Sequence, residues 1–208
     1  MAAIDWVGGH GDRLYALTKT ADLWLYDLGN QRAHKLATEG LGRSHFVLSP
    51  DGQYLAGWWT GAEEVKTYEI KPSALEVIGK SFAPGLEAMS FEGENLLLAS
   101  ADTSWQFNLS TRIRKTSDQS PGDYHGFKAP YFDRSARHWV DPSHKVSYFV
   151  EGRLIGAWGE TPVRRMSYPD VICAATVHHS DGALLLANRF GEIWQLPPFS
   201  QLEEEEGE

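Results

Sequence analysis

The 208-residue sequence contains one cysteine, Cys173, so it cannot form a disulfide within a single chain. No run of residues approaches the ~18 apolar positions that a membrane-spanning helix needs. The first residues also lack the basic stretch followed by an apolar one that marks an export signal. From these absences we expect a cytoplasmic protein that does not associate with a membrane.

Positive charge is also scarce. The chain has 19 Lys and Arg against 28 Asp and Glu, which gives a formal net charge of −9. Five of the negative charges are glutamates of residues 203–208, and a run of like charges is typical of a disordered tail. Because the remaining residues have no excess of cations, the composition argues against a nucleic-acid partner.

The motifs of common enzyme classes are absent as well. The sequence has no G-x-S-x-G, no H-E-x-x-H, no Walker loop and no paired cysteines. His138, Asp141 and His144 would suit a metal ion on a helix, but strands and Pro142 are expected there. We therefore predict a protein that is not an enzyme and has no metal and no cofactor. A pair of glycosidase carboxylates from separate strands stays open as an alternative.

What the sequence does contain is a repeat. Two markers, two residues apart, recur inside short alternating strands at spacings of 42, 39, 43 and 46 residues. A period of about 40 to 45 residues, with strands and no helical pattern, is typical of a β-propeller with four-stranded blades. The first marker falls on Trp24, Lys66, Trp105, Tyr148 and Trp194, and the second on Tyr26, Tyr68, Phe107, Val150 and Leu196.

The repeat predicts an all-β fold, a small β-propeller of five blades with three to four antiparallel strands each. The fourth unit has the weakest pattern, and its strands are expected at 129–132, 136–140, 145–150 and 154–158. We expect the ring to close by packing of blade faces, without a strand exchanged between the chain ends. The predicted blades cover residues 4–40, 41–85, 86–128, 129–170 and 171–202, followed by the tail at 203–208.

Two segments resemble the WD40 family of propeller proteins. Residues 46–52, Phe-Val-Leu-Ser-Pro-Asp-Gly, are similar to the strand and turn of a WD40 blade. Residues 22–27, Asp-Leu-Trp-Leu-Tyr-Asp, are similar to the later strand of such a blade. The resemblance implies a platform for protein–protein interaction.

The longest stretch without a strand pattern, residues 111–130, is the main candidate binding segment. Long loops in compact domains often carry function, and arginine and aromatic side chains dominate interface energetics. A disordered polar connector is the alternative interpretation. The candidate partner-binding residues in this segment are Arg112, Arg114, Tyr124, His125 and Phe127.

Trp58 and Trp59 point to opposite faces of a predicted strand, so either could stack on a ligand. Packing in the core is the favoured interpretation, since both faces of a propeller blade are covered by neighbours, and ligand stacking is the alternative.

These observations favour a non-catalytic scaffold that binds a partner protein through loops at one end of the ring, such as 8–12, 49–52, 111–130 and 179–182. A carbohydrate-binding, lectin-like propeller and an inhibitor or immunity protein of a basic toxin are the alternatives.

Overall fold

The computed structural model describes residues 4–36, 44–59, 62–116, 131–133, 138–141, 146–158, 164–178 and 181–197. All regular structure in these residues is β-strand, which confirms the all-β prediction. Within this part of the chain, no helix is long and apolar enough to cross a membrane. The predicted acidic tail at 203–208 lies outside the described residues.

The first two sheets are four-stranded antiparallel meanders in which each strand pairs with the next. The first sheet consists of β1 (Ile4–His10), β2 (Arg13–Thr18), β3 (Leu23–Asp27) and β4 (Arg32–Leu36). The second sheet consists of β5 (Ser44–Leu48), β6 (Tyr54–Trp59), β7 (Glu64–Ile70) and β8 (Leu75–Phe82).

The prediction of five blades needs a correction, because the described strands form four hydrogen-bonded sheets. Strand β13 pairs with β9 on one side and with β14 on the other, so the third and fourth units merge into one nine-stranded sheet. The last sheet has three described strands, β18 (Ile172–Val177), β19 (Leu184–Asn188) and β20 (Ile193–Leu196).

The nine-stranded sheet contains the strands of the third and fourth units. In the fourth unit it has the four predicted strands and one more. Its strands are β9 (Leu86–Glu92), β10 (Asn95–Ser100), β11 (Ser104–Asn108), β12 (Arg114–Thr116), β13 (Tyr131–Asp133), β14 (His138–Asp141), β15 (Val146–Glu151), β16 (Leu154–Trp158) and β17 (Arg164–Ser167). Strands β13 to β16 fall on the four expected segments. Strand β17 was not predicted, and it pairs with β16.

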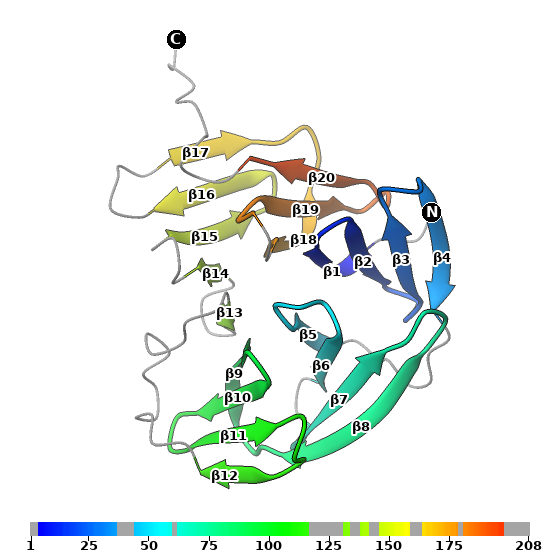
Figure 1. The fold of residues 1–208 in the computed structure, drawn as a ribbon. Helices are drawn as coiled ribbons and strands as arrows, with labels where there is room; N and C mark the ends of the chain where they lie inside the picture. Colours follow the sequence, from blue (N-terminus) through cyan, green and yellow to red (C-terminus); the bar gives the residue numbers. More distant parts are fainter. Residues whose placement is uncertain are drawn as a thin grey trace.

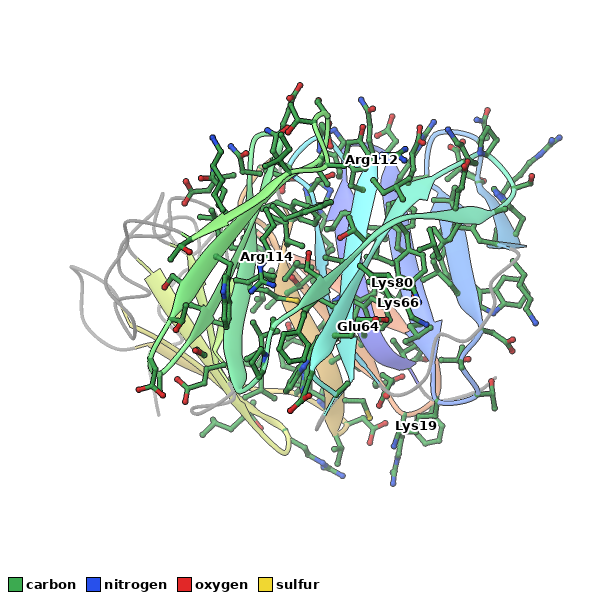
Figure 2. The ribbon with its side chains drawn as sticks, turned by 90° about the horizontal axis from the view of Figure 1, so that it is seen from below. Lys19, Glu64, Lys66, Lys80, Arg112 and Arg114 are labelled. Carbon is green, nitrogen blue, oxygen red and sulfur yellow. The ribbon has the colours of Figure 1, made fainter. Side chains whose placement is uncertain are left out.

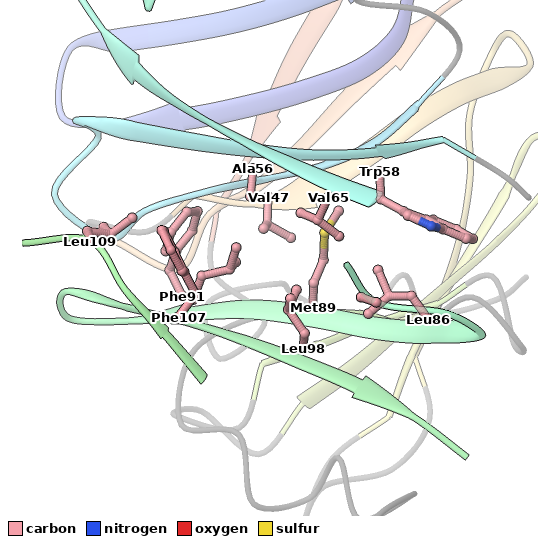
Figure 3. Packing of buried hydrophobic residues seen from close by; sticks show 12 residues of the cluster. Val47, Ala56, Trp58, Val65, Leu86, Met89, Phe91, Leu98, Phe107 and Leu109 are labelled. Atoms are coloured by element: carbon pink, nitrogen blue, oxygen red, sulfur yellow. The ribbon is translucent and has the colours of Figure 1, made fainter. Parts of the chain in front are cut away.

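The sheets stand around a common centre, which makes the fold a β-propeller (Figure 1). Strands β1, β5, β9 and β18 lie nearest the middle, while β4, β8 and β12 lie toward the rim. Neighbouring sheets pack face to face. One buried cluster lies between the first and second sheets, and another lies between the second sheet and strands β9 to β11 (Figure 3).

Strand β2 shows why the inner strands have continuous apolar runs. Tyr15 and Leu17 point into the cluster shared with the second sheet, whereas Leu14 and Ala16 point into a cluster shared with the last sheet. A strand that is buried on both faces cannot alternate apolar with polar residues. Burying each large side chain stabilises the fold by about 1.5–3 kcal/mol.

The ring closes between the first and last sheets, as expected, by packing of faces. Strand β1 pairs with β2 and packs against β18 and β19, while the last sheet contains only β18 to β20 in the part of the chain that is described. The closing cluster combines Ile4, Val7, Leu14 and Ala16 with Ala174, Leu185 and Ala187.

Candidate functional site

Three inner turns meet at one end of the ring. The turn between β1 and β2 contacts the turn between β18 and β19, where Nε2 of His178 lies 3.2 Å from the carbonyl oxygen of Gly11. The turn between β5 and β6 contacts the first sheet, where the Tyr15 hydroxyl donates to the carbonyl oxygen of Gly52 over 3.4 Å. We call this end of the ring, with the turns at 11–12, 49–53, 93–94 and 109–113 and the described residues between β18 and β19, the turn end.

Figure 2 places Arg112 at the same end. Arg112 and Lys19 lie at opposite ends of the side view. Lys19 follows β2, whereas Gly11 precedes it, so Arg112 shares its end with the Gly11 turn. The turn that contains Arg112 also contacts the turn between β9 and β10, because the Leu109 amide donates to the carbonyl oxygen of Glu94. The turn end therefore includes residues of three sheets besides the second.

The His178 side chain of the turn end is buried, and both of its ring nitrogens lie within hydrogen-bonding distance of an oxygen atom. Its ring is 4% exposed, and its Nδ1 lies 2.7 Å from Oδ1 of Asp181. The same carboxylate oxygen accepts a hydrogen bond from the Ala183 amide at 3.0 Å. With Gly11 at the other ring nitrogen, the imidazole is held in one orientation and ties the last sheet to the first.

The turn between β5 and β6 is built in a similar way. The Ser49 hydroxyl donates to Oδ1 of Asp51 at 2.5 Å and accepts a hydrogen bond from the Tyr54 amide. Oδ1 of Asp51 also accepts a hydrogen bond from the Gln53 amide at 3.0 Å. Such short-range bonds between side chains and backbone fix the turn without help from a partner molecule.

Each inner turn described above exposes an acidic side chain. Where such turns are fixed by hydrogen bonds, the carboxylates are also held in position, so a basic partner would lose little conformational entropy by pairing with them. The exposed acids of the inner turns are Asp12, Asp51, Glu94 and Asp181.

The two candidate arginines occupy different environments. Arg112 is exposed in the turn after β11 and has a left-handed backbone, with φ of 58°. Arg114 (labelled in Figure 2) is the first residue of β12, directly after this turn. Its guanidinium carbon lies over the Trp105 ring, 4.8 Å from the ring centroid. Burial lowers the pKa of Arg114 below its ordinary value. Arg114 therefore makes an intramolecular contact, whereas Arg112 faces solvent.

The other candidate residues of this loop, Tyr124, His125 and Phe127, lie outside the described residues. The side chains of His138 and Asp141, and all of His144, also lie outside them. Among the residues that are described, no group of three His, Cys, Asp or Glu side chains could hold a metal ion.

Trp58 belongs to the core and offers no open ring face to a ligand. It is 3% exposed between the second and nine-stranded sheets (Figure 3), and its indole nitrogen donates to the Ala62 carbonyl at 2.9 Å. One ring face stacks on His45, with the ring centroids 5.4 Å apart. Trp58 therefore packs in the core, which is the interpretation that the sequence favoured, and the Trp59 side chain lies outside the described residues.

Sequence reasoning did not identify the contact between His178 and Gly11. The sequence predicted loops at 8–12 and 179–182, but 167 residues separate His178 from Gly11. No local pattern reports a contact over such a distance, since it depends on the closure of the ring.

Comparison with known proteins supports the fold and does not indicate a function. No family model matches the chain, and no curated protein matches it. The chain is similar to a chain in the crystal structure of the mitotic checkpoint complex, with 10% identity over 93% of this chain and 87% of that chain, and a TM-score of 0.53. It is also similar to a structural genomics protein of unknown function from Bacteroides thetaiotaomicron, with 11% identity over 92% of this chain and 68% of that chain, and a TM-score of 0.58.

These two are among 966 solved chains that match. At such low identities the likeness concerns the fold alone, and a fold shared so widely does not select a function. The protein is a β-propeller.

Proposed function

We propose that this β-propeller is a non-catalytic, cytoplasmic scaffold of WD40-like type that binds a basic partner protein at its turn end. The observation that carries the proposal is the exposed acid on each of four inner turns, Asp12, Asp51, Glu94 and Asp181. Hydrogen bonds from the Gln53 and Ala183 amides hold two of these acids, Asp51 and Asp181, in place.

Acidic side chains that are fixed in position favour a partner of the opposite sign, because complementary potentials speed association and discriminate against wrong partners. Arg112 adds an exposed side chain of a type that often anchors interfaces. The lectin-like alternative has less support, since Trp58 is occupied by core contacts.

The test compares charge reversals at the two ends of the ring. The full chain would be purified from its native source with its bound proteins, alongside the double variant Asp12→Lys with Glu94→Lys. We expect the native chain to retain one basic protein in a fixed ratio and the variant to lose it. The matched control, Asp102→Lys, reverses an exposed acid at the opposite end and should keep the partner.

Absence of any partner in a fixed ratio, or equal loss in the control, would contradict the proposal. A glycan array run on the same native protein would separate the lectin-like reading, for which a sugar and not a basic protein would bind.

A further inference from the structure

Strands β3 and β11, each the third strand of its repeat unit, have the same local structure. Each ends in a residue whose side chain closes the next turn, since Asp27 Oδ1 accepts from the Asn30 amide at 2.9 Å and Asn108 Oδ1 accepts from the Thr111 amide at 2.8 Å. The hydrogen bonds from Asn30 lower the pKa of Asp27 below its ordinary value.

The correspondence continues beyond the turn. Gln31 and Arg112 each lie four residues after the capping residue, and both have left-handed backbones, with φ of 53° and 58°. The two segments can therefore be matched residue by residue. On this basis two equivalent apolar stripes are defined, the open stripe of Trp24, Tyr26 and Leu28 and the covered stripe of Trp105, Phe107 and Leu109.

The covered stripe is buried by the outer strand of the preceding sheet. Phe107 and Leu109 are each 5% exposed and belong to the cluster shared with the second sheet. Strand β8 approaches so closely that a Cβ on Gly79 would lie 2.8 Å from Cζ of Phe107. Gly79 thus gives β8 the room to lie across the stripe.

The interface between the first and second sheets has the same arrangement. Tyr68 of β7, at the equivalent marker position, is 2% exposed and packs in one cluster with Leu36 of β4. In both interfaces, the third-strand aromatic residue is buried under the fourth strand of the sheet before it.

No described strand covers the open stripe in this way. Tyr26 is only half-buried and Leu28 is 46% exposed, although both occupy the positions of the buried Phe107 and Leu109. The sheet before it in the ring is the last sheet, whose outermost described strand is β20 (Figure 1). Tyr26 and Ile193 of β20 both pack at the margin of the closing cluster. The open stripe is therefore continuous with the packed interface between the first and last sheets.

The sequence that follows β20 is poorly suited to a fourth strand. Leu196 is followed by two prolines, which lack the backbone donor that a sheet ladder needs. Four consecutive glutamates begin at residue 203, and glutamate is depleted in strands. These compositions disfavour a fourth strand formed by residues 197–206.

We propose that the edge of β20, which pairs with no strand in the described part of the chain beyond β19, and the open stripe form a receptor for one extended segment of a partner protein. The segment would pair antiparallel with β20 and complete the last sheet, a mode of recognition in which main-chain hydrogen bonds give affinity and alternate side chains give specificity. Because β8 shows the equivalent occupant within the same molecule, the segment should be apolar at alternate positions. It should also have glycine or another small residue opposite Tyr26, as Gly79 lies opposite Phe107.

This receptor lies between the first and last sheets and does not depend on the basic partner of the turn end. The variants that test it differ from Asp12→Lys and Glu94→Lys, so one proposal can fail while the other stands.

The test uses a labelled peptide with the sequence of residues 74–83, the segment that contains β8, and the full chain. We expect saturable binding by fluorescence anisotropy, weakened roughly tenfold or more by Leu28→Glu. The matched control is Ile113→Glu, which places the same charge on a 53% exposed side chain next to the corresponding turn and should leave binding unchanged. A second peptide that carries Gly79→Trp should not bind, because the indole would overlap Tyr26.

Three results would overturn the proposal. The first is no saturable binding of the unaltered peptide. The second is binding that Leu28→Glu does not weaken, as would occur if the peptide merely displaced β8 from the second sheet. The third is a roughly tenfold gain in affinity in the double variant Phe199→Glu with Leu202→Glu, since that gain would mean that the chain's own continuation occupies the receptor.

Discussion

Nε2 of His178 lies 3.2 Å from the carbonyl oxygen of Gly11, and this contact joins the last sheet to the first. The imidazole also packs tightly on the backbone of β1, because a Cβ on Gly9 would lie 2.4 Å from Cδ2 of His178. A ring that closes by packing alone depends on such contacts, since no exchanged strand holds the described ends together.

Replacement of His178 by alanine should destabilise the protein by about 2–4 kcal/mol, because the change leaves a buried cavity and removes the hydrogen-bonded contacts of the imidazole with Asp181 and Gly11. Urea unfolding would measure the loss. The control His34→Ala removes an exposed ring that contacts the Pro72 carbonyl at 3.0 Å, and it should cost less than about 1 kcal/mol. Equal losses in the two variants would contradict the importance assigned to the closing contact.

Addition of a methyl group at Gly9 should destabilise the interface between the first and last sheets. The new Cβ would meet His178 at 2.4 Å and Leu185 at 2.7 Å, so we expect Gly9→Ala to cost about 1–3 kcal/mol in the free energy of unfolding. At Gly29 the nearest atom to an added Cβ is 3.5 Å away, which is an ordinary contact. Thermal unfolding of Gly29→Ala should therefore remain within about 0.5 kcal/mol of the native value, and a larger loss there than at Gly9 would refute the steric argument.

The two arginines of the candidate loop should respond in opposite ways to glycine. At Arg112 the left-handed backbone favours glycine, so Arg112→Gly should leave stability unchanged or raise it by up to ~1 kcal/mol. Arg114→Gly should lower stability by about 1–2 kcal/mol, because it weakens strand β12 and removes the stack on Trp105. Chemical denaturation of both variants is the measurement, and a loss at Arg112 as large as that at Arg114 would contradict it.

Tyr68 should make the protein sensitive to alkali. Burial, together with the nearby charge of Glu64, raises the pKa of Tyr68 to about 12 from an ordinary value of 10.0. Since the folded state disfavours the phenolate, the contribution of Tyr68 to stability is fully present below pH 10 and is lost as the pH rises toward 12. Unfolding measured across this range should show a decline that is smaller in Tyr68→Phe.

The same substitution has a second consequence near neutral pH. The Tyr68 hydroxyl is buried and has no hydrogen-bond partner among the described residues. Its removal should therefore leave stability unchanged or raise it by about 1 kcal/mol. A loss of more than that amount at pH 7 would show that the hydroxyl has a partner and would remove the basis of the alkaline prediction.

The spacing of the sequence markers located the third strand of each repeat unit. Trp24, Trp105 and Trp194 all lie in the third strands of their units, β3, β11 and β20. Even in the weakly patterned fourth unit, Tyr148 and Val150 fall within β15. Strand position is readable from sequence because alternation and turn residues act over only a few neighbouring positions.

The division into sheets was not readable in this way. Strand β13 is three residues long and pairs with both β9 and β14, and this double pairing merges two expected blades into one sheet. The environment of Arg114 was also hidden, because its stack on Trp105 depends on the register between β11 and β12. Register and partner choice follow from pairing between strands, which one segment of sequence does not report.

The amino-acid sequence by itself determined that this chain is an all-β protein of repeated meanders with apolar inner strands, because those features depend on local periodicity and turn chemistry. Only the tertiary structure decided how the ring closes, that Trp58 is a core residue, and that Leu28 is exposed where its counterpart Leu109 is buried. The physical reason is that Leu28 and Leu109 occupy the same local position, and what covers each of them is supplied by a different, sequence-distant sheet.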